Sequence, residues 1–138
     1  GNNSVNDDRY SEILKVAQRR LLDILIDQLP QDNAGNAWDA ADGPDVKVRF
    51  SDSTGVVAYT TSTMMNVDVT GDVTFIDTSV PFELRPTTYT VEILDEDDTA
   101  DEVMATFSID LDAYVPDETR TIDFANGNAT MAISYELF

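Results

Sequence analysis

Residues 89–107 read YTVEILDEDDTADEVMATF, in which two runs of alternating apolar and polar residues flank a short acidic segment. Alternation with a period of two is typical of half-buried strands. The segment between the runs, residues 95–102 (DEDDTADE), carries six carboxylates in eight residues and is named here the acidic turn. The stretch therefore predicts a strand, a charged turn and a returning strand, and it raises the question of what balances the charge.

The overall charge of the chain excludes several classes of partner. Its 138 residues, the length of a single domain, include 27 Asp and Glu against 8 Lys and Arg, a formal net charge of −19. With no basic stripe to neutralise phosphates, neither nucleic acid nor a bare anionic membrane is an expected partner. The chain has no Cys and no His, which excludes disulfides, Cys or His zinc sites and triads with a His base. Oxygen ligands remain, and they suit hard cations such as calcium.

The sequence after residue 45 has an all-β pattern. Short runs with apolar alternation are separated by turn residues, and Asn126-Gly127 is the strongest hairpin signal among them. The expected strands lie within the runs DVKVRF, GVVAYTT, DVTFID, PFEL, TYTVEIL, VMATFSIDL, TRTIDF and NATMAISYELF. This spacing predicts an all-β fold, an eight-stranded antiparallel Greek-key β-sandwich.

Two interpretations fit the N-terminal segment. Apolar residues fall at helical spacing from the leader into the next segment, at Tyr10, Ile13, Leu14, Ala17, Leu21 and Leu25. Leu22, Ile24 and Ile26, however, alternate as in a strand before the breaker Pro30. We therefore expect a short helix over about residues 8–18 and a strand over about residues 20–27. A single continuous helix is the competing interpretation.

The chain divides into a leader and one domain. Residues 1–19 are expected to form a polar leader with the short helix, and residues 20–138 the sandwich. Within the sandwich, residues 30–44 (PQDNAGNAWDAADGP) are rich in turn-forming residues and make up the long loop. Loops of this length in a compact domain are often functional. Its Trp38 is expected to anchor the loop against the sandwich, with an exposed contact role as the alternative.

Alternation also predicts the core. Apolar residues at every second position of a half-buried strand face the interior. The expected core residues are Val46, Val48, Phe50, Val57, Tyr59, Val91, Ile93, Phe107, Ile109, Ile122, Phe124, Met131, Ile133 and Tyr135. Packing is the ordinary role of aromatic and methionine side chains in such a pattern.

The acidic turn has a metal-binding and a purely structural interpretation. Asp95 and Asp97 are two residues apart, so they point to one side if the chain stays extended. Two carboxylates held close repel each other unless a cation lies between them, and calcium takes six to eight oxygen ligands. Further carboxylates stand in the long loop and just after it, at Asp39 and Asp45. If the two loops lie at the same end of the sandwich they form one calcium site, and otherwise the turn is a well-solvated tip.

These motifs resemble those of the calcium-dependent lipid-binding domains, the C2-type domains known from synaptotagmins and protein kinase C. The run LLDILIDQLP is similar to the family's first strand with its Leu-Pro end. Asp39 and Asp45 have the family's six-residue separation before a VKV strand. The run VEILDEDDTADEVMATFSIDL resembles the family's third loop and the strand that follows it. The resemblance covers about residues 20–138.

The resemblance implies a C2-like β-sandwich that binds calcium between its acidic loops. It places the side chains of the metal ligands at Asp39, Asp45, Asp95, Asp97 and Glu102. The backbone carbonyls of Trp38 and Glu96 would complete the shell.

From these observations we expect a non-catalytic, calcium-binding interaction module of an exported or cell-envelope protein. The ion would order the two acidic loops and present them to a protein or surface ligand that the sequence does not identify. An ion-free structural or adhesion sandwich is the alternative, and an enzyme ranks third. Binding to membrane lipid is not expected without calcium, because residues 59–65 (YTTSTMM), at the place where the resembled family often has a basic lipid-binding patch, contain no Lys. A composition without Cys, poor in Lys and rich in Thr and Asp fits an exported protein, located in the periplasm, at the cell surface or outside the cell.

Overall fold

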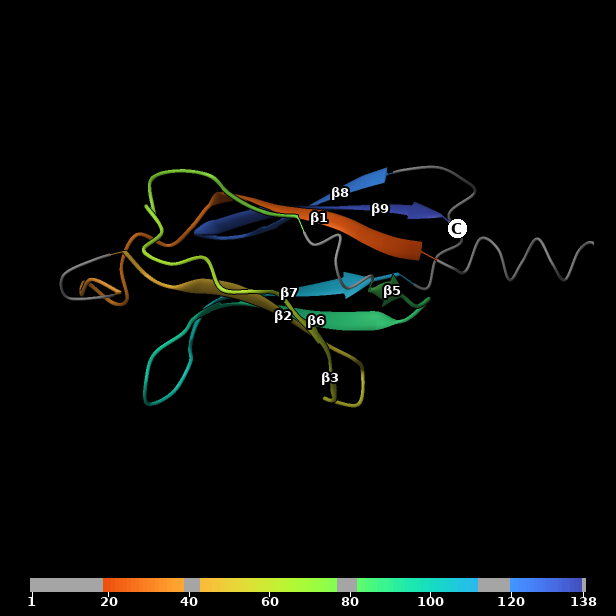
Figure 1. Cartoon of the computed structure of the whole chain (residues 1–138), viewed down its shortest axis with the longest axis horizontal. Helices are drawn as coiled ribbons and strands as arrows, with labels where there is room; N and C mark the ends of the chain where they lie inside the picture. Colours follow the sequence, from red (N-terminus) through yellow and green to blue (C-terminus); the bar gives the residue numbers. More distant parts are fainter. Residues whose placement is uncertain (1–18, 39–42, 77–81, 112–119, 138) are drawn as a thin grey trace, which may run out of the picture.

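The structure is a computed structural model that describes residues 19–38, 43–76, 82–111 and 120–137. These residues form nine strands in two antiparallel sheets that pack face to face (Figure 1). The all-β class predicted from the sequence is therefore confirmed.

The strands divide between the sheets as follows. One sheet has the order β4-β1-β9-β8 with β5 paired to β1, and the other has the order β3-β2-β6-β7. The first contains β1 (Arg19–Gln28), β4 (Val73–Ile76), β5 (Glu83–Leu84), β8 (Arg120–Asn126) and β9 (Ala129–Leu137). The second contains β2 (Val46–Ser51), β3 (Val57–Thr60), β6 (Thr88–Asp95) and β7 (Glu102–Asp110). None of the described segments forms a helix long and apolar enough to cross a membrane.

β1 confirms the strand predicted near residues 20–27. It lies between β4 and β9, and its ladder with β9 pairs Ile24 with Ile133. The continuous-helix interpretation is therefore wrong for this stretch, while the helix expected over residues 8–18 lies outside the described residues. The described residues contain nine strands rather than eight, because the two-residue β5 forms a short ladder beside Arg19.

The core lies between the two sheets, and alternation predicts most of it. Along β2 the burial pattern alternates strictly, with Val46, Val48 and Phe50 fully buried. The other predicted core residues that are buried are Val91, Ile93, Phe107, Ile109, Met131, Ile133 and Tyr135. The Phe82 ring stacks on Tyr59 at 4.8 Å between centroids and meets Phe50 edge-on at 5.4 Å.

Four predicted core positions lie at the margins of the sandwich instead. Val57 is 51% exposed, so its assignment to the core is wrong. It stands on β3, a four-residue strand at the edge of its sheet, where the side chains have little of the opposite sheet to cover them. Tyr59 on the same strand, and Ile122 and Phe124 on the edge strand β8, are partly buried and pack against the core.

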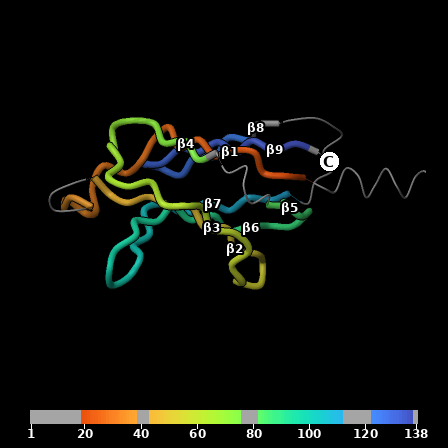
Figure 2. Tube along the Cα trace, viewed as in Figure 1, coloured from red at the N-terminus to blue at the C-terminus, as the bar shows by residue number. Residues whose placement is uncertain are grey.

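The loops of interest gather at one end of the molecule. Figures 1 and 2 show the described part of the long loop (residues 30–38 and 43–44), the β3–β4 connection and the β8–β9 turn at that end, with the acidic turn between β6 and β7 projecting beside them. In the long loop, the backbones of Asn33 and Asn36 exchange hydrogen bonds of 2.7 and 3.1 Å. The Trp38 indole donates to the carbonyl of Pro30 at 2.9 Å and packs against the core, which confirms its anchoring role.

The chain leaves the long loop pressed against residues 64–67. Val67 donates its backbone N–H to the Pro44 carbonyl at 2.8 Å, and Val46 and Met64 exchange two backbone hydrogen bonds of 2.8 Å. A Cβ atom on Gly43 would lie 1.9 Å from the Val67 carbonyl oxygen, far inside van der Waals contact. Only glycine fits this crossing without a shift of the backbone.

Replacing Gly43 by Ala is therefore expected to lower the free energy of unfolding by about 1–3 kcal/mol, the usual cost of overpacking. Urea unfolding followed by circular dichroism measures it. Gly71→Ala is the matched control, because its added methyl would lie 3.6 Å from the Asp68 carbonyl oxygen, an ordinary contact. That variant should be neutral or gain up to about 1 kcal/mol through the lower entropy of its unfolded chain. Equal effects of the two substitutions would contradict the close crossing.

Candidate metal centre

The β6–β7 hairpin brings the two ends of the acidic turn together. Asp95 is the last residue of β6 and pairs in register with Glu102, the first residue of β7. A register shift between Ile93 and Leu94 interrupts the alternation, so Leu94 and Asp95 are both fully buried. Such irregularities re-aim side chains at strand ends. The hairpin thus turns a carboxylate inward at the end of the sandwich.

Three carboxylates converge there. One oxygen from each of Asp95, Asp97 and Glu102 lies within 4.8 Å of the other two. Asp95 is buried, and the other two side chains are partly buried. Like charges held this close repel each other, and a cation between them relieves the repulsion. A group of carboxylate oxygens at this spacing has the chemistry that hard cations require.

Asp45, the residue just before β2, joins that strand to the cluster through backbone hydrogen bonds. Its backbone N–H donates to Asp95 Oδ1 at 3.1 Å, and its carbonyl accepts from the backbone N–H of Glu96 at 2.7 Å. Its own carboxylate accepts from the backbone N–H of Asn66 at 3.0 Å, where Asn66 has a positive φ of 52°. Asp45 therefore links β2, the acidic turn and the β3–β4 connection, although its carboxylate is outside the cluster of three.

The long loop also reaches the cluster. Asn33 Nδ2 donates to Glu102 Oε2 at 2.7 Å, across 69 positions of sequence. The predicted meeting of the two loops is thus confirmed, through Asn33 and Asp45. Asp39 lies outside the described residues. The carbonyls of Trp38 and Glu96 stay predictions as ligands.

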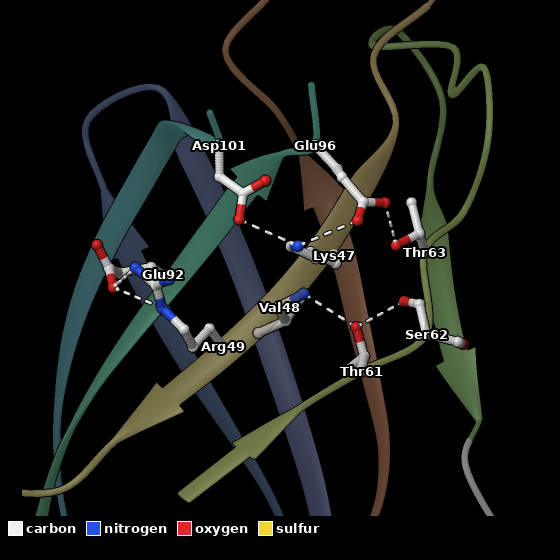
Figure 3. A network of polar contacts seen from close by, with 9 residues as sticks. All are labelled: Lys47, Val48, Arg49, Thr61, Ser62, Thr63, Glu92, Glu96 and Asp101. Carbon is white, nitrogen blue, oxygen red and sulfur yellow. Dashed lines mark hydrogen bonds and ion pairs between the residues drawn. The ribbon is translucent and has the colours of Figure 1, made fainter. Parts of the chain in front are cut away.

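Sequence reasoning missed a second polar network on the outer face of β2 (Figure 3). There Lys47 Nζ lies 3.0 Å from Asp101 Oδ2 and 3.3 Å from Glu96 Oε1. Thr63 donates its hydroxyl to Glu96 Oε2 at 2.7 Å. The signal in the sequence is alternation, since Lys47 lies between the inward-facing Val46 and Val48 and must face outward.

These contacts shift the pKa values of Lys47 and Glu96. Partial burial alone would lower the pKa of Lys47, but the hydrogen bonds and charges of Asp101 and Glu96 outweigh it and raise that pKa above 10.5. The pKa of Glu96 is lowered from 4.5, first by the Thr63 hydroxyl and then by the hydrogen bond and charge of Lys47. Both groups are therefore ionised at neutral pH, and the network is an ion pair.

The molecule is thus an all-β sandwich with an acidic cluster at the end where its loops meet. No protein-family model matches the sequence, and no curated protein is detectably similar to it. Solved structures do resemble it. A structure of a C2 domain aligns at 17% identity over 87% of this chain and 96% of its own, with a TM-score of 0.59. A C2 domain of plant extended synaptotagmin 1 aligns at 16% identity over 90% and 97% of the two chains, with a TM-score of 0.53.

A third similar structure is human GIVD cytosolic phospholipase A2, solved in complex with an inhibitor and terbium chloride. The match covers 87% of this chain but only 16% of that longer one, at 17% identity and a TM-score of 0.62. Identities this low establish the fold alone. The chain therefore has a C2-like fold, as its motifs predict.

The lowered pKa of Glu96 predicts an acid-dependent loss of stability. A carboxylate with a depressed folded pKa contributes stability above its unfolded value, here 4.5, and the contribution is lost as pH falls through the folded value. The melting temperature of the wild type should exceed that of Glu96→Gln at pH 6, and the gap should close as the pH is lowered below about 4.5. Differential scanning calorimetry over pH 2.5–7 measures the gap.

Thr63→Val provides the control for that measurement. At pH 6, removing the hydroxyl should lower the melting temperature more when Glu96 is present than in the Glu96→Gln background, because the two residues are coupled. A gap between wild type and Glu96→Gln that stays constant down to pH 2.5 would show that Glu96 contributes nothing through its charge.

Proposed function

We propose that this domain is a non-catalytic, calcium-binding interaction module, built as a Greek-key C2-type sandwich. The observation that carries the proposal is the convergence of three carboxylates, one of them fully buried, at the end of the sandwich where the loops meet. One oxygen of each lies within 4.8 Å of the others. A buried carboxylate beside two others is costly unless a cation or hydrogen-bond donors compensate it. The absence of Cys and His from the chain leaves oxygen ligands, the set that calcium prefers.

The three carboxylates supply at most about six oxygens, whereas calcium takes six to eight. We propose that the remaining ligands come from the long loop and its end: the Asp39 carboxylate, the second oxygen of Asp45 and the carbonyls of Trp38 and Glu96. Water would fill any position left. Affinity in this arrangement is on the order of 10⁻⁴–10⁻³ M, the range of extracellular modules.

The proposed mechanism is electrostatic. Without the ion, mutual repulsion among Asp95, Asp97 and Glu102 favours a looser turn; with it, the turn and the long loop become one rigid surface. The proposed partner is a protein or surface ligand that contacts this ordered end. Neither nucleic acid nor, in the absence of calcium, membrane lipid fits the net charge of −19. Calcium concentrations that match the affinity favour an exported protein, in the periplasm, at the cell surface or outside the cell.

An ion-free structural or adhesion module is the second candidate. It is favoured by the donors that already meet the acidic residues: the Asp45 N–H on Asp95, the Asn33 amide on Glu102, and Lys47 on Glu96 and Asp101. In that case the hydrogen bonds alone hold the loops, and calcium has no effect on stability.

Calcium should raise the melting temperature of chelator-treated protein, because the native state alone has the site. At 10 mM calcium and a dissociation constant on the order of 10⁻⁴–10⁻³ M, the free energy of unfolding should rise by about 1.4–2.7 kcal/mol. For a chain of this length that corresponds to roughly 4–10 °C. Asp97→Asn should remove most of the shift by taking one ligand from the cluster.

Asp98→Asn is the matched control, since it makes the same change of charge in the same turn but lies outside the cluster. It should keep a shift close to that of the wild type. Loss of the shift in both variants would attribute it to diffuse screening of the acidic surface, and the absence of any shift in the wild type would favour the ion-free module.

A further inference from the structure

The ammonium group of Lys47 contacts two carboxylates of the acidic turn at once. It lies between the carboxylates of Asp101 and Glu96, at 3.0 and 3.3 Å, on the outer face of the sheet formed by β3, β2, β6 and β7 (Figure 3). The side chain is only 15% exposed, so most of its stem is covered by the surrounding protein. Both oxygens of Glu96 are engaged, one by Lys47 and the other by the Thr63 hydroxyl.

The carboxylates of the acidic turn thus fall into two sets. The inner set, Asp95, Asp97 and Glu102, converges at the end of the sandwich, and the outer set, Glu96 and Asp101, meets at Lys47. The sets interleave along the chain, as expected where successive side chains of extended backbone point in opposite directions. Each set holds like charges together, and within the described residues the outer set has the ammonium group of Lys47 between its two members.

We propose that Lys47 is a positioning residue that fills the outer cation position, holds Glu96 and Asp101 away from the inner carboxylates, and so limits the acidic turn to a single divalent ion. The statement about the inner ion rests on the proposed function. The statement about the outer position rests on the contacts of Lys47 alone. In this arrangement the lysine determines how many ions the turn accepts.

A purely structural role for Lys47 makes a different prediction. Ion pairs of partly exposed side chains contribute little to stability, and their loss normally changes only the melting temperature. Removing a resident cation instead leaves Glu96 and Asp101 close together with their repulsion uncompensated, and a divalent ion relieves it. The number of bound ions therefore separates the two roles.

Arg49 offers a matched control on the same strand. Its guanidinium contacts Glu92 Oε1 through Nε at 3.2 Å and Nη2 at 2.8 Å, on the same outward-facing side of β2 two residues further on. It meets one carboxylate rather than two, away from the acidic turn. Arg49→Met changes the net charge by the same amount as Lys47→Met, so it reports any general gain in calcium binding from a more negative surface.

The experiment counts calcium ions bound per chain by equilibrium dialysis of the metal-free protein, up to about 20 mM free calcium and at physiological ionic strength, which screens diffuse binding. Lys47→Met and Lys47→Gln should each bind one more ion than the wild type. Lys47→Arg, which keeps the charge, and Arg49→Met should bind the same number as the wild type. Adding Glu96→Gln and Asp101→Asn to Lys47→Met should abolish the additional ion.

The count in the wild type and the difference between variants decide separate questions. A wild-type count of zero overturns the proposed calcium site, whereas a gain of one ion in the lysine variants still supports a resident cation at the outer position. The inference about Lys47 is overturned if neither folded lysine variant gains an ion, if Arg49→Met gains as much, or if the additional ion survives loss of both outer carboxylates. Circular dichroism establishes that each variant is folded, and Lys47→Gln keeps a polar end on the side chain should Lys47→Met not fold.

Discussion

The repulsion among three carboxylates at the end of one hairpin is the constraint around which this end of the molecule is organised. The β6–β7 ladder sets Asp95 opposite Glu102 with no freedom to separate them, and Asp97 joins them within 4.8 Å. The register shift after Ile93 turns Asp95 into the interior, where exclusion of water strengthens every electrostatic interaction. A fold that builds such a cluster has to compensate it by hydrogen bonds, by charges of its own or by an ion.

Segments far apart in the sequence supply the first two kinds of compensation. The N–H of Asp45 and the amide of Asn33 bring β2 and the long loop onto the cluster, while Lys47 offsets part of the charge of Glu96 and Asp101. Because each of these groups lies on a different element, the acidic turn acts as the point at which the loops of this end are joined. Binding of a cation there would stabilise the turn and the geometry of the surrounding surface together, as the proposed calcium-dependent recognition requires.

Much of this was predictable from the sequence, and the exceptions have physical causes. Alternation identified the hairpin, β1 and most of the core, and the paired carboxylates at Asp95 and Asp97 indicated the site. The core prediction for Val57 is wrong because alternation indicates which residues share a face of a strand, but not whether an opposing sheet covers that face. Asn33 and Lys47 could not be assigned to Glu102 and Asp101, because those contacts depend on how the loops cross in space.

The most direct test of the account is the position of a bound hard cation. Crystals grown with terbium, whose anomalous scattering locates the ion without assumptions about ligands, should show their strongest peak about 2.3–2.6 Å from oxygens of Asp95, Asp97 and Glu102, as for calcium. A peak there, absent from crystals of Asp97→Asn, is the result that the account predicts. Terbium bound only elsewhere on the acidic surface, or no ordered ion in crystals that hold it in excess, would contradict it.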